Sequence, residues 1–295
     1  MASEANPIPA KNRVELHAHS TASDGRQAPA ELAALAAGEG LSLLALTDHD
    51  TLAGLAPARA AARERQIAFL PGVEISTSWH GHSVHLLAYF PADWELEAET
   101  ARAFSAWMEA SRALRRKRNA RLAENFRRLG IPLDAEALEE ERRRAGGHQL
   151  GRPHIARWLV EHGHAGSTAD AFARFLTPGA PTYTRLEGLP TQEAIAQVHA
   201  AGGMASLAHP CRIKFDWRRR LGELAGNGAA GRLDAIEVYY PQHSPSEVRD
   251  YEELARQYRL ARSGGSDFHG RPEDRLASMA LPEGLFADWP IAMPP

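Results

Sequence analysis

The interpretation of the whole chain starts from one stretch, Val14-Glu15-Leu16-His17-Ala18-His19-Ser20-Thr21-Ala22-Ser23-Asp24-Gly25. Its apolar beginning predicts a short buried parallel strand, and its small and polar residues predict a loop after that strand. His17 and His19 lie where the strand gives way to the loop. Residues i and i+2 of an extended chain project to the same side, so both imidazoles face one point, about 7 Å apart or less. Two surface histidines that merely alternate would look the same, but the position favours a divalent metal at the carboxyl end of a strand.

Length and composition limit the protein to the soluble globular class. With 295 residues, 44% hydrophobic and 24% charged, the chain can form one large α/β domain or two ordinary ones. No apolar run approaches the ~20 residues that cross a bilayer, and Met1–Asn12 lacks the apolar core of a signal peptide. Cys211 is the single cysteine, so an internal disulfide is excluded. We therefore expect a cytoplasmic protein with no membrane partner and no obligate protein partner.

Strands and helices alternate at the spacing of βα units in two parts of the chain, which predicts an α/β fold with a parallel sheet or barrel. These parts are residues 13–97 and 180–290, and we assign both to one barrel domain. Between them, residues 98–179 have helical periodicity only, including a long helix from about Phe104 to Gly130. We interpret this segment as an α-helical insertion that binds substrate beside or over the barrel.

Imidazole and carboxylate side chains recur at or just past the ends of the predicted strands. They are His17, His19, Asp48, His49, Glu74, His85, His209, Asp267 and His269. Each alone could be a helix cap or a hydrogen-bonded core histidine. Together, on strands that converge in a barrel, they would share one pocket, and so dense a cluster requires cations to neutralise it. Nitrogen and oxygen ligands without thiolate suit zinc, manganese or iron rather than a structural zinc site.

These residues form a series of motifs that resembles the PHP (polymerase and histidinol phosphatase) family. The motifs are His17-x-His19 with Ser23-Asp24-Gly25, Thr47-Asp48-His49, Gly72-Val73-Glu74, Val84-His85, Leu207-Ala208-His209-Pro210 and Gly265-Ser266-Asp267-Phe268-His269-Gly270. All occur in order and span about residues 13 to 270. The helical insertion further resembles the branch of nucleoside 3',5'-bisphosphate phosphatases and related 5'-to-3' exoribonucleases.

The resemblance implies a distorted (β/α)7 barrel with a trinuclear metal centre. Its ligands would form three groups: His17, His19, Glu74 and Asp267; Glu74, His85 and His209; and Asp24, His49 and His269. Mn2+ is the expected metal, and iron or zinc are alternatives. Asp48 would orient a ligand or carry a proton.

A metal pair that shares a carboxylate suits phosphoester hydrolysis, because it holds a bridging hydroxide of lowered pKa in line with phosphorus. The cations also neutralise charge that develops on the phosphoryl oxygens. The leaving 3'-oxygen needs a proton, and the candidate catalytic residues are Asp48, His209 and His269. We therefore expect a metal-dependent phosphoric ester hydrolase.

A substrate with a second phosphate needs an anchor away from the metals. The candidate contacts are Lys117, Arg118 and Asn119 on the long helix, with Arg152 and His154 at the start of a later helix. Most basic side chains of residues 115–121 are expected to form a solvated helix face. We predict removal of the 3'-phosphate from nucleoside 3',5'-bisphosphates, and 5'-to-3' trimming of short 5'-phosphorylated RNA.

Three other functions stay open. The same metal centre could hydrolyse a simple phosphomonoester such as histidinol phosphate. A non-catalytic PHP domain of a polymerase is a second alternative, although this chain keeps every expected ligand and has no polymerase region. An amidohydrolase is the third, but it usually uses a bridging lysine on a strand, and no predicted strand here supplies one.

Overall fold

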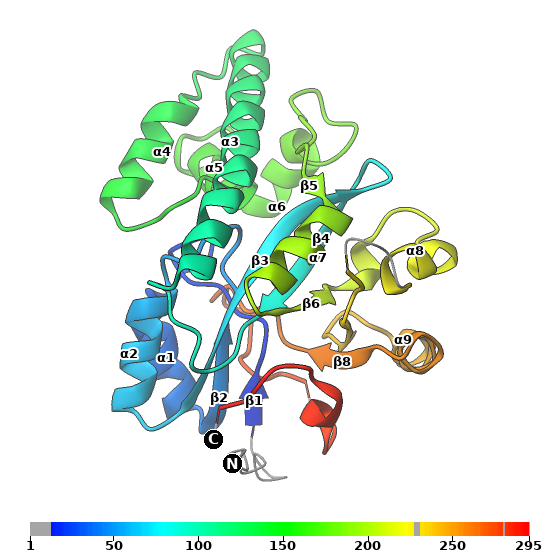
Figure 1. The fold of residues 1–295 in the computed structure, drawn as a ribbon. Coiled ribbons are helices and arrows are strands. Elements are labelled where there is room, and N and C mark those ends of the chain that lie inside the picture. Colours follow the sequence, from blue (N-terminus) through cyan, green and yellow to red (C-terminus); the bar gives the residue numbers. More distant parts are fainter. Residues whose placement is uncertain (1–12, 227–230, 280, 295) are drawn as a thin grey trace.

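An eight-stranded sheet lies at the centre of the computed structural model, which describes residues 13–226, 231–279 and 281–294 (Figure 1). The strands are β1 (Arg13–Glu15), β2 (Leu41–Leu46), β3 (Ala68–Trp79), β4 (His82–Tyr89), β5 (Leu189–Pro190), β6 (Met204–Leu207), β7 (Ala235–Tyr239) and β8 (Ala261–Gly264). Their order is β1-β2-β3-β4-β6-β7-β8, and β5 pairs with β3. The prediction that Met1–Asn12 is not a signal peptide concerns residues outside these ranges.

The sheet is mostly parallel, as expected, but one strand reverses its direction. β4 is antiparallel to both β3 and β6, whereas the remaining strand pairs are parallel. β1 and β8 lie at the two ends of the order, and one parallel bridge between Ala18 and Phe268 joins the chain segments that follow them. Within the described residues no strand ladder joins β1 to β8, so the closed (β/α)7 barrel stays a prediction.

The reversal is made by a β-hairpin that joins β3 to β4. The first part of β3 pairs in parallel with β2, from Leu43–Ala68 to Leu46–Pro71. The rest of β3 pairs with β4 across a two-residue turn, where His80 and Gly81 have φ of 47° and 74°. Two positive φ angles are the geometry of a type I′ hairpin turn, whose twist matches that of the strands.

Helices cover the sheet on both sides and extend above it. Those of the predicted barrel segments are α1 (Pro29–Gly38), α2 (Leu55–Glu64), α7 (Thr191–Ala200), α8 (Leu221–Ala225) and α9 (Pro245–Tyr258). The central segment forms α3 (Glu99–Arg128), α4 (Ala135–Arg144), α5 (Arg152–Glu161), α6 (Thr168–Ala171) and a π-helical turn, Phe172–Leu176. Short 3-10 turns follow at Pro210–Arg212, Arg218–Arg220 and Leu285–Asp288. Among the described helices, none combines the length and apolarity that a membrane span requires.

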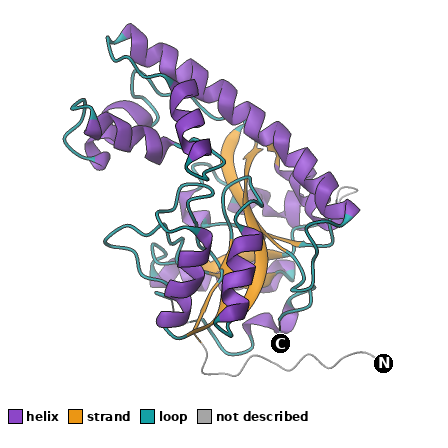
Figure 2. Ribbon diagram, turned by 90° about the vertical axis from the view of Figure 1, so that its left-hand side faces the viewer, coloured by secondary structure: helices purple, strands orange, loops and turns teal. Residues whose placement is uncertain are grey.

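Two hydrophobic clusters share the long helix α3. One cluster fills the sheet and its helices and includes Phe104 and Met108 from the first half of α3. The other includes Leu122 and Phe126 from the second half of α3, packed with side chains of α5. Figure 2 shows α3 running from the sheet to the far end of the helical region. The middle of α3 therefore lies between two packed regions, and it faces the site described next.

Candidate active site

The predicted ligands converge at one edge of the sheet, but two of them do not lie at strand ends. Glu74 is in the interior of β3, because the hairpin prolongs that strand beyond the end of β2. His85 is in the first half of β4, and an antiparallel strand brings its beginning to the edge where parallel strands finish. The prediction that all ligands follow strand ends is therefore wrong for these two residues. A bridge between His49 and Glu74 brings the loop after β2 to the same edge.

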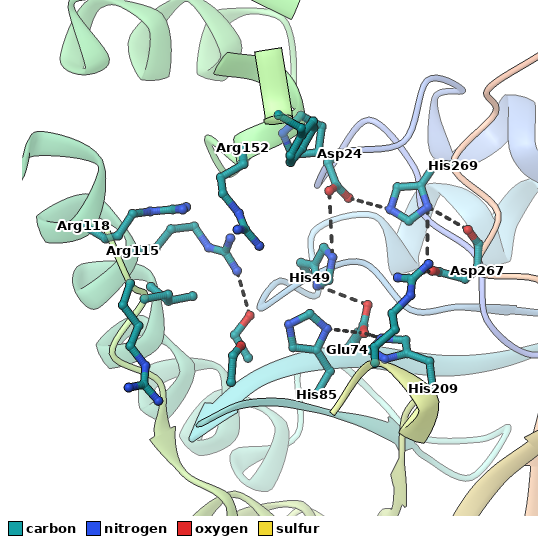
Figure 3. Close-up of a pocket in the computed structure, with 18 of the residues that line it drawn as sticks. Asp24, His49, Glu74, His85, Arg115, Arg118, Arg152, His209, Asp267 and His269 are labelled. Atoms are coloured by element: carbon teal, nitrogen blue, oxygen red, sulfur yellow. Dashed lines mark hydrogen bonds and ion pairs between the residues drawn. The ribbon is translucent and has the colours of Figure 1, made fainter. Parts of the chain in front are cut away.

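Glu74 is the centre of the cluster, and five imidazoles surround its carboxylate. Figure 3 shows three of them, those of His49, His85 and His209. On one side, Oε1 lies 2.7 Å from His85 Nδ1 and 2.9 Å from His209 Nε2. On the other, Oε2 lies 3.2 Å from both His19 Nε2 and His49 Nδ1, and 3.3 Å from His17 Nε2. Burial would raise the pKa of Glu74, but the imidazoles hold that pKa well below its usual range. Glu74 could therefore be a ligand of more than one cation.

Two further carboxylates complete the cluster on either side of Glu74. Asp267 Oδ1 lies 3.4 Å from His17 Nε2 and 3.2 Å from His19 Nε2. Asp24 Oδ1 lies 3.3 Å from His269 Nε2. Burial opposes a charge on His19, but Asp267 and Glu74 raise the pKa of this imidazole to about 10. Such surroundings attract positive charge, which a divalent cation would supply in place of protons.

The ligand atoms fall into three compact groups, each within 4.8 Å of one another. The groups are His17, His19, Glu74 and Asp267; His19, Asp24, His49 and His269; and His49, Glu74 and His85. The first matches the expected group, and the second adds His19 to the expected three. In the third, His49 takes the place expected for His209, which instead approaches Glu74 Oε1 from the side.

Buried atoms without hydrogen-bond partners show that the cluster fits a metal. Among the described residues, His17 Nε2, both ring nitrogens of His19, His49 Nδ1 and Glu74 Oε2 have no hydrogen-bond partner. Leaving so many polar atoms unpaired in one buried place is costly unless a cation coordinates them. The donor set contains imidazole nitrogen and carboxylate oxygen, which suits zinc, manganese or iron.

Residues behind the cluster orient it, and sequence reasoning missed them. Glu237, fully buried in β7, has Oε1 2.9 Å from His17 Nδ1 and accepts at Oε2 a hydrogen bond from the His209 N–H at 2.6 Å. Glu15 accepts from the N–H of His17 and from Ser266. A carboxylate in an apolar strand needs partners, so the glutamate in each of these two strands was a usable signal.

Backbone strain also concentrates here. His209 and Asp267 have φ of 26° and 55°, and Asp50 in the loop after β2 has φ of 49°. A non-glycine residue in this conformation costs about 1–3 kcal/mol. Such residues typically occur at functional sites, where the direction of a side chain matters. The hydrogen bond from the His209 N–H to Glu237 secures one such residue.

Asp48 is turned away from the cluster. Its Oδ1 accepts hydrogen bonds from the Ser20 N–H at 2.8 Å and the Ser23 hydroxyl at 2.6 Å, and its Oδ2 accepts from the Ser20 hydroxyl at 2.6 Å. The side chain is buried. These contacts hold the loop that carries His19 and Asp24, so we assign Asp48 a positioning role; proton transfer by Asp48 stays an untested prediction without support from this geometry.

Across the cleft from the cluster lie three arginines, which we call the arginine anchor: Arg115, Arg118 and Arg152 (Figure 3). Arg118 is 4% exposed, and none of the described residues gives its guanidinium a hydrogen bond or ion pair. Its burial and the neighbouring Arg115 and Arg152 lower its pKa to about 9. Arg115 donates to the buried Asp50 and to Ser76, while Arg152 donates to the Leu176 carbonyl at 3.1 Å. One buried and two half-buried arginines line this cleft, and such groups can bind an anion.

Of the five predicted substrate contacts, Arg118 and Arg152 line this cleft, and the other three do not. Lys117 is exposed on the other face of α3. Asn119 is buried and donates to the Leu150 carbonyl at 2.9 Å, so its side chain joins α3 to the segment before α5. His154 Nδ1 accepts the Gly151 N–H at 2.9 Å and thereby caps α5. Contact with substrate stays a prediction for these three residues, and the geometry gives it no support.

A family model and curated relatives identify this arrangement. The model described as the PHP domain matches residues 15–127. The chain is 38% identical to the 5'-3' exoribonuclease Rnm of Escherichia coli over 284 residues, which cover 94% of this chain and 92% of the relative. The chain belongs to the PHP-domain family. It is an enzyme of the PHP phosphoesterase type, with a His, Glu and Asp cluster that can bind metal.

Other PHP-domain proteins are similar over most of their length. The 3',5'-nucleoside bisphosphate phosphatase of Chromobacterium violaceum is 37% identical, covering 88% of each chain. A solved structure from the same organism, described as an amidohydrolase with bound sulfate and no metal, has a TM-score of 0.79 and 32% identity, covering 92% of this chain and 93% of its own. Another, described as a candidate metal-dependent phosphoesterase from Bifidobacterium adolescentis, has a TM-score of 0.79 and 29% identity, covering 96% of each chain.

Proposed function

We propose that this chain removes the 3'-phosphate of nucleoside 3',5'-bisphosphates, so that adenosine 3',5'-bisphosphate yields AMP and phosphate. We further propose that the same site trims short 5'-phosphorylated RNA from its 5' end. The supporting observation is one cleft that holds the Glu74 cluster on one side and the arginine anchor on the other. The names of two relatives, a bisphosphate phosphatase and a 5'-3' exoribonuclease, support the two proposed activities.

Both reactions break the same bond. Water attacks the phosphorus, the bond from phosphorus to the 3'-oxygen breaks, and the 3'-oxygen takes up a proton. With a bisphosphate the products are a 5'-mononucleotide and phosphate. With RNA they are a 5'-mononucleotide and a remainder that keeps the phosphate as its new 5' end, ready for another round.

The cluster supplies the metal ligands of this reaction. We assign His17, His19, Asp24, His49, Glu74, His85, His209, Asp267 and His269 to up to three divalent ions, with Mn2+ preferred and iron or zinc as alternatives. When bound, such ions lower the pKa of water and neutralise charge on the phosphoryl oxygens. His209 and His269 line the cleft and are the candidates for protonating the leaving oxygen.

The arginine anchor holds the 5'-phosphate and thereby positions the 3'-ester. Guanidinium groups bind phosphate through paired charge-assisted hydrogen bonds, and Arg118 has its donors available. Binding energy at this remote phosphate would be used to orient the reacting one. An amidohydrolase activity gains no support, because the two lysines among the described residues, Lys117 and Lys214, lie outside the strands.

A substrate panel tests the proposal. With manganese present, adenosine 3',5'-bisphosphate should be hydrolysed with a kcat/KM at least ~10-fold above that of 3'-AMP, which lacks the anchored phosphate. Histidinol phosphate should be poorer still. Preference for histidinol phosphate would replace this proposal with a simple phosphomonoesterase, and no turnover of any phosphoester with bound metal would favour a non-catalytic domain.

A further inference from the structure

A second groove opens beyond the Asp24 and His269 side of the cleft. We call it the side groove; it has a volume of about 580 Å³ and is lined by Arg26, Arg157 and Arg271. It shares Asp24, Pro153, Phe172, His269 and Arg271 with the cleft, so the two hollows lie next to each other beside the Glu74 cluster.

The three arginines reach this place from three elements. Arg26 and Arg271 each come two residues after a cluster residue, Asp24 and His269 respectively. The Arg26 N–H donates to the His269 carbonyl at 3.0 Å, which holds the two loops together. Gly270 tightens this contact, since its φ is 74° and an added Cβ would lie 1.9 Å from Gln27 Oε1. Arg26 and Arg271 are therefore positioned by the same loops that position the metal ligands.

Arg157 comes from α5, the helix that also supplies Arg152 to the anchor. The two residues are five positions apart and therefore leave the helix in different directions, about 140° apart around its axis. Arg152 lines the cleft, whereas Arg157 lines the side groove. Burial and the charge of Arg26 lower the pKa of Arg157, so two guanidiniums are held near each other here. One helix thus carries cations into both hollows.

The groove arginines differ from most exposed arginines of the helices. Arg116, Arg127 and Arg143, for example, each form an ion pair with a glutamate. Within the described residues, the side chains of Arg26, Arg157 and Arg271 have neither an ion pair nor a hydrogen bond. Two carboxylates line the groove: Asp24, which faces His269, and Glu273. The local charge of the groove therefore favours an anion.

We propose that the side groove binds the RNA strand downstream of the scissile phosphate. The inference rests on the proposed function. If the 5'-phosphate lies on the arginine anchor and the scissile phosphate lies on the cluster, the next nucleotide of the strand continues past Asp24 and His269. The guanidiniums would then contact the next phosphodiester, and Phe172 offers an apolar face to a base. A bisphosphate ends at the cluster and does not enter the groove.

Three substrates separate the groove from the rest of the site: adenosine 3',5'-bisphosphate, the dinucleotide pApA and the trinucleotide pApApA. They share the 5'-phosphate and the scissile phosphate, but only the trinucleotide has a phosphodiester beyond it. The double variant Arg26→Gln/Arg157→Gln should lower kcat/KM for pApApA about tenfold, while kcat/KM for the bisphosphate changes less than about twofold. Arg219→Gln, at an arginine with an 88% exposed side chain, is the control for loss of one charge.

Binding gives a readout that does not need turnover. In the Glu74→Gln background, fluorescence anisotropy should show that the double variant weakens pApApA binding about tenfold but not pApA binding. It should also reduce the salt dependence of pApApA binding, because fewer phosphate contacts release fewer counterions. Equal losses on all three substrates, or no loss on pApApA, would overturn the groove assignment. Arg185 lines the cleft itself, so Arg185→Gln would overturn the groove assignment only if it weakened pApApA binding much more than pApA binding, which would place the additional phosphodiester near Arg185. Failure of wild-type bisphosphate hydrolysis would instead reject the proposed function, while the binding result would still decide the groove.

Discussion

The two sides of the cleft are built in opposite ways. On the cluster side, imidazoles and carboxylates surround one another, and residues such as Glu237 and Asp48 hold them from behind. On the anchor side, Arg118 is buried without a hydrogen bond or ion pair from the described residues, although Arg115 and Arg152 are nearby. One side carries excess ligand atoms for cations, and the other carries excess positive charge. A ligand of opposite charge would therefore complete each side: a cation at the cluster and an anion at the anchor.

The largest effect should follow from removing the bridge on the cluster side. Glu74→Gln keeps the shape but removes the charge that faces five imidazoles. We expect kcat to fall by about a thousandfold or more, with less metal bound per chain. Turnover assays and metal analysis of the purified variant measure both quantities. Glu223→Gln is the matched control, since Glu223 pairs with a histidine at the surface; near-normal turnover of Glu74→Gln with unchanged metal content would refute the bridging role.

On the anchor side, activity and stability should move in opposite directions. Arg118→Met should lower kcat/KM for adenosine 3',5'-bisphosphate by roughly 10- to 100-fold, because a charge-assisted phosphate contact is lost. It should affect 3'-AMP much less. The same change should stabilise the fold by about 1–3 kcal/mol, since it replaces a buried unpaired charge with an apolar side chain. Urea unfolding and a two-substrate assay test this, with Arg116→Met on the exposed face as control. Destabilisation together with equal losses on both substrates would show that Arg118 is structural.

A smaller effect concerns the ion pair beneath the anchor. Burial would raise the pKa of Asp50, but Arg115 lowers that pKa below its usual value. The pair therefore stabilises the fold above about pH 4, and this stabilisation is lost as pH falls through the folded-state pKa. Asp50→Asn should cost about 1–2 kcal/mol at pH 7, and the cost should shrink near pH 3. Chemical unfolding at the two pH values measures it; a cost that does not change with pH would mean that the hydrogen bond from the Ser76 N–H, not the charge, matters.

The smallest effect should come from Lys117, next to Arg118 in sequence but on the exposed face of α3. Lys117→Gln should change stability by less than about 0.5 kcal/mol. We also expect kcat/KM for the bisphosphate to change less than about twofold, because the side chain lies outside the cleft. Comparison with Arg118→Met under identical conditions checks this. A tenfold loss in Lys117→Gln would restore it as a substrate contact.

The cluster side could be predicted from the sequence because its residues are unusual where they occur. A histidine or aspartate directly after an apolar strand has few structural roles, and several such positions on one sheet edge converge. The local sequence did not show that β4 runs antiparallel. Leu86 and Ala88 would be buried in either direction, so the alternation of apolar residues does not fix the direction of a strand.

The anchor side was harder to predict because a basic run on a helix usually faces solvent. A usable signal was nevertheless present. Phe104, Met108, Leu122 and Phe126 recur at helical spacing, and the same stripe passes through Arg118. An arginine inside an apolar stripe is either buried or bound to a partner. The density of charge along α3 does not distinguish Arg118 from its exposed neighbour Lys117, whereas the phase of the helix does.

The packing of α3 at both ends has a consequence for the distance between the two phosphates of a substrate. The helix is about 45 Å long and is packed into one hydrophobic cluster near its start and into another near its end. Arg118 lies between these fixed ends, so it cannot shift toward or away from Glu74 without disturbing a core. If the anchor holds a 5'-phosphate and the cluster holds the next phosphate, this rigid span is a ruler for a single nucleotide. Such an enzyme would release one nucleotide at each turnover and would have no preference for base sequence.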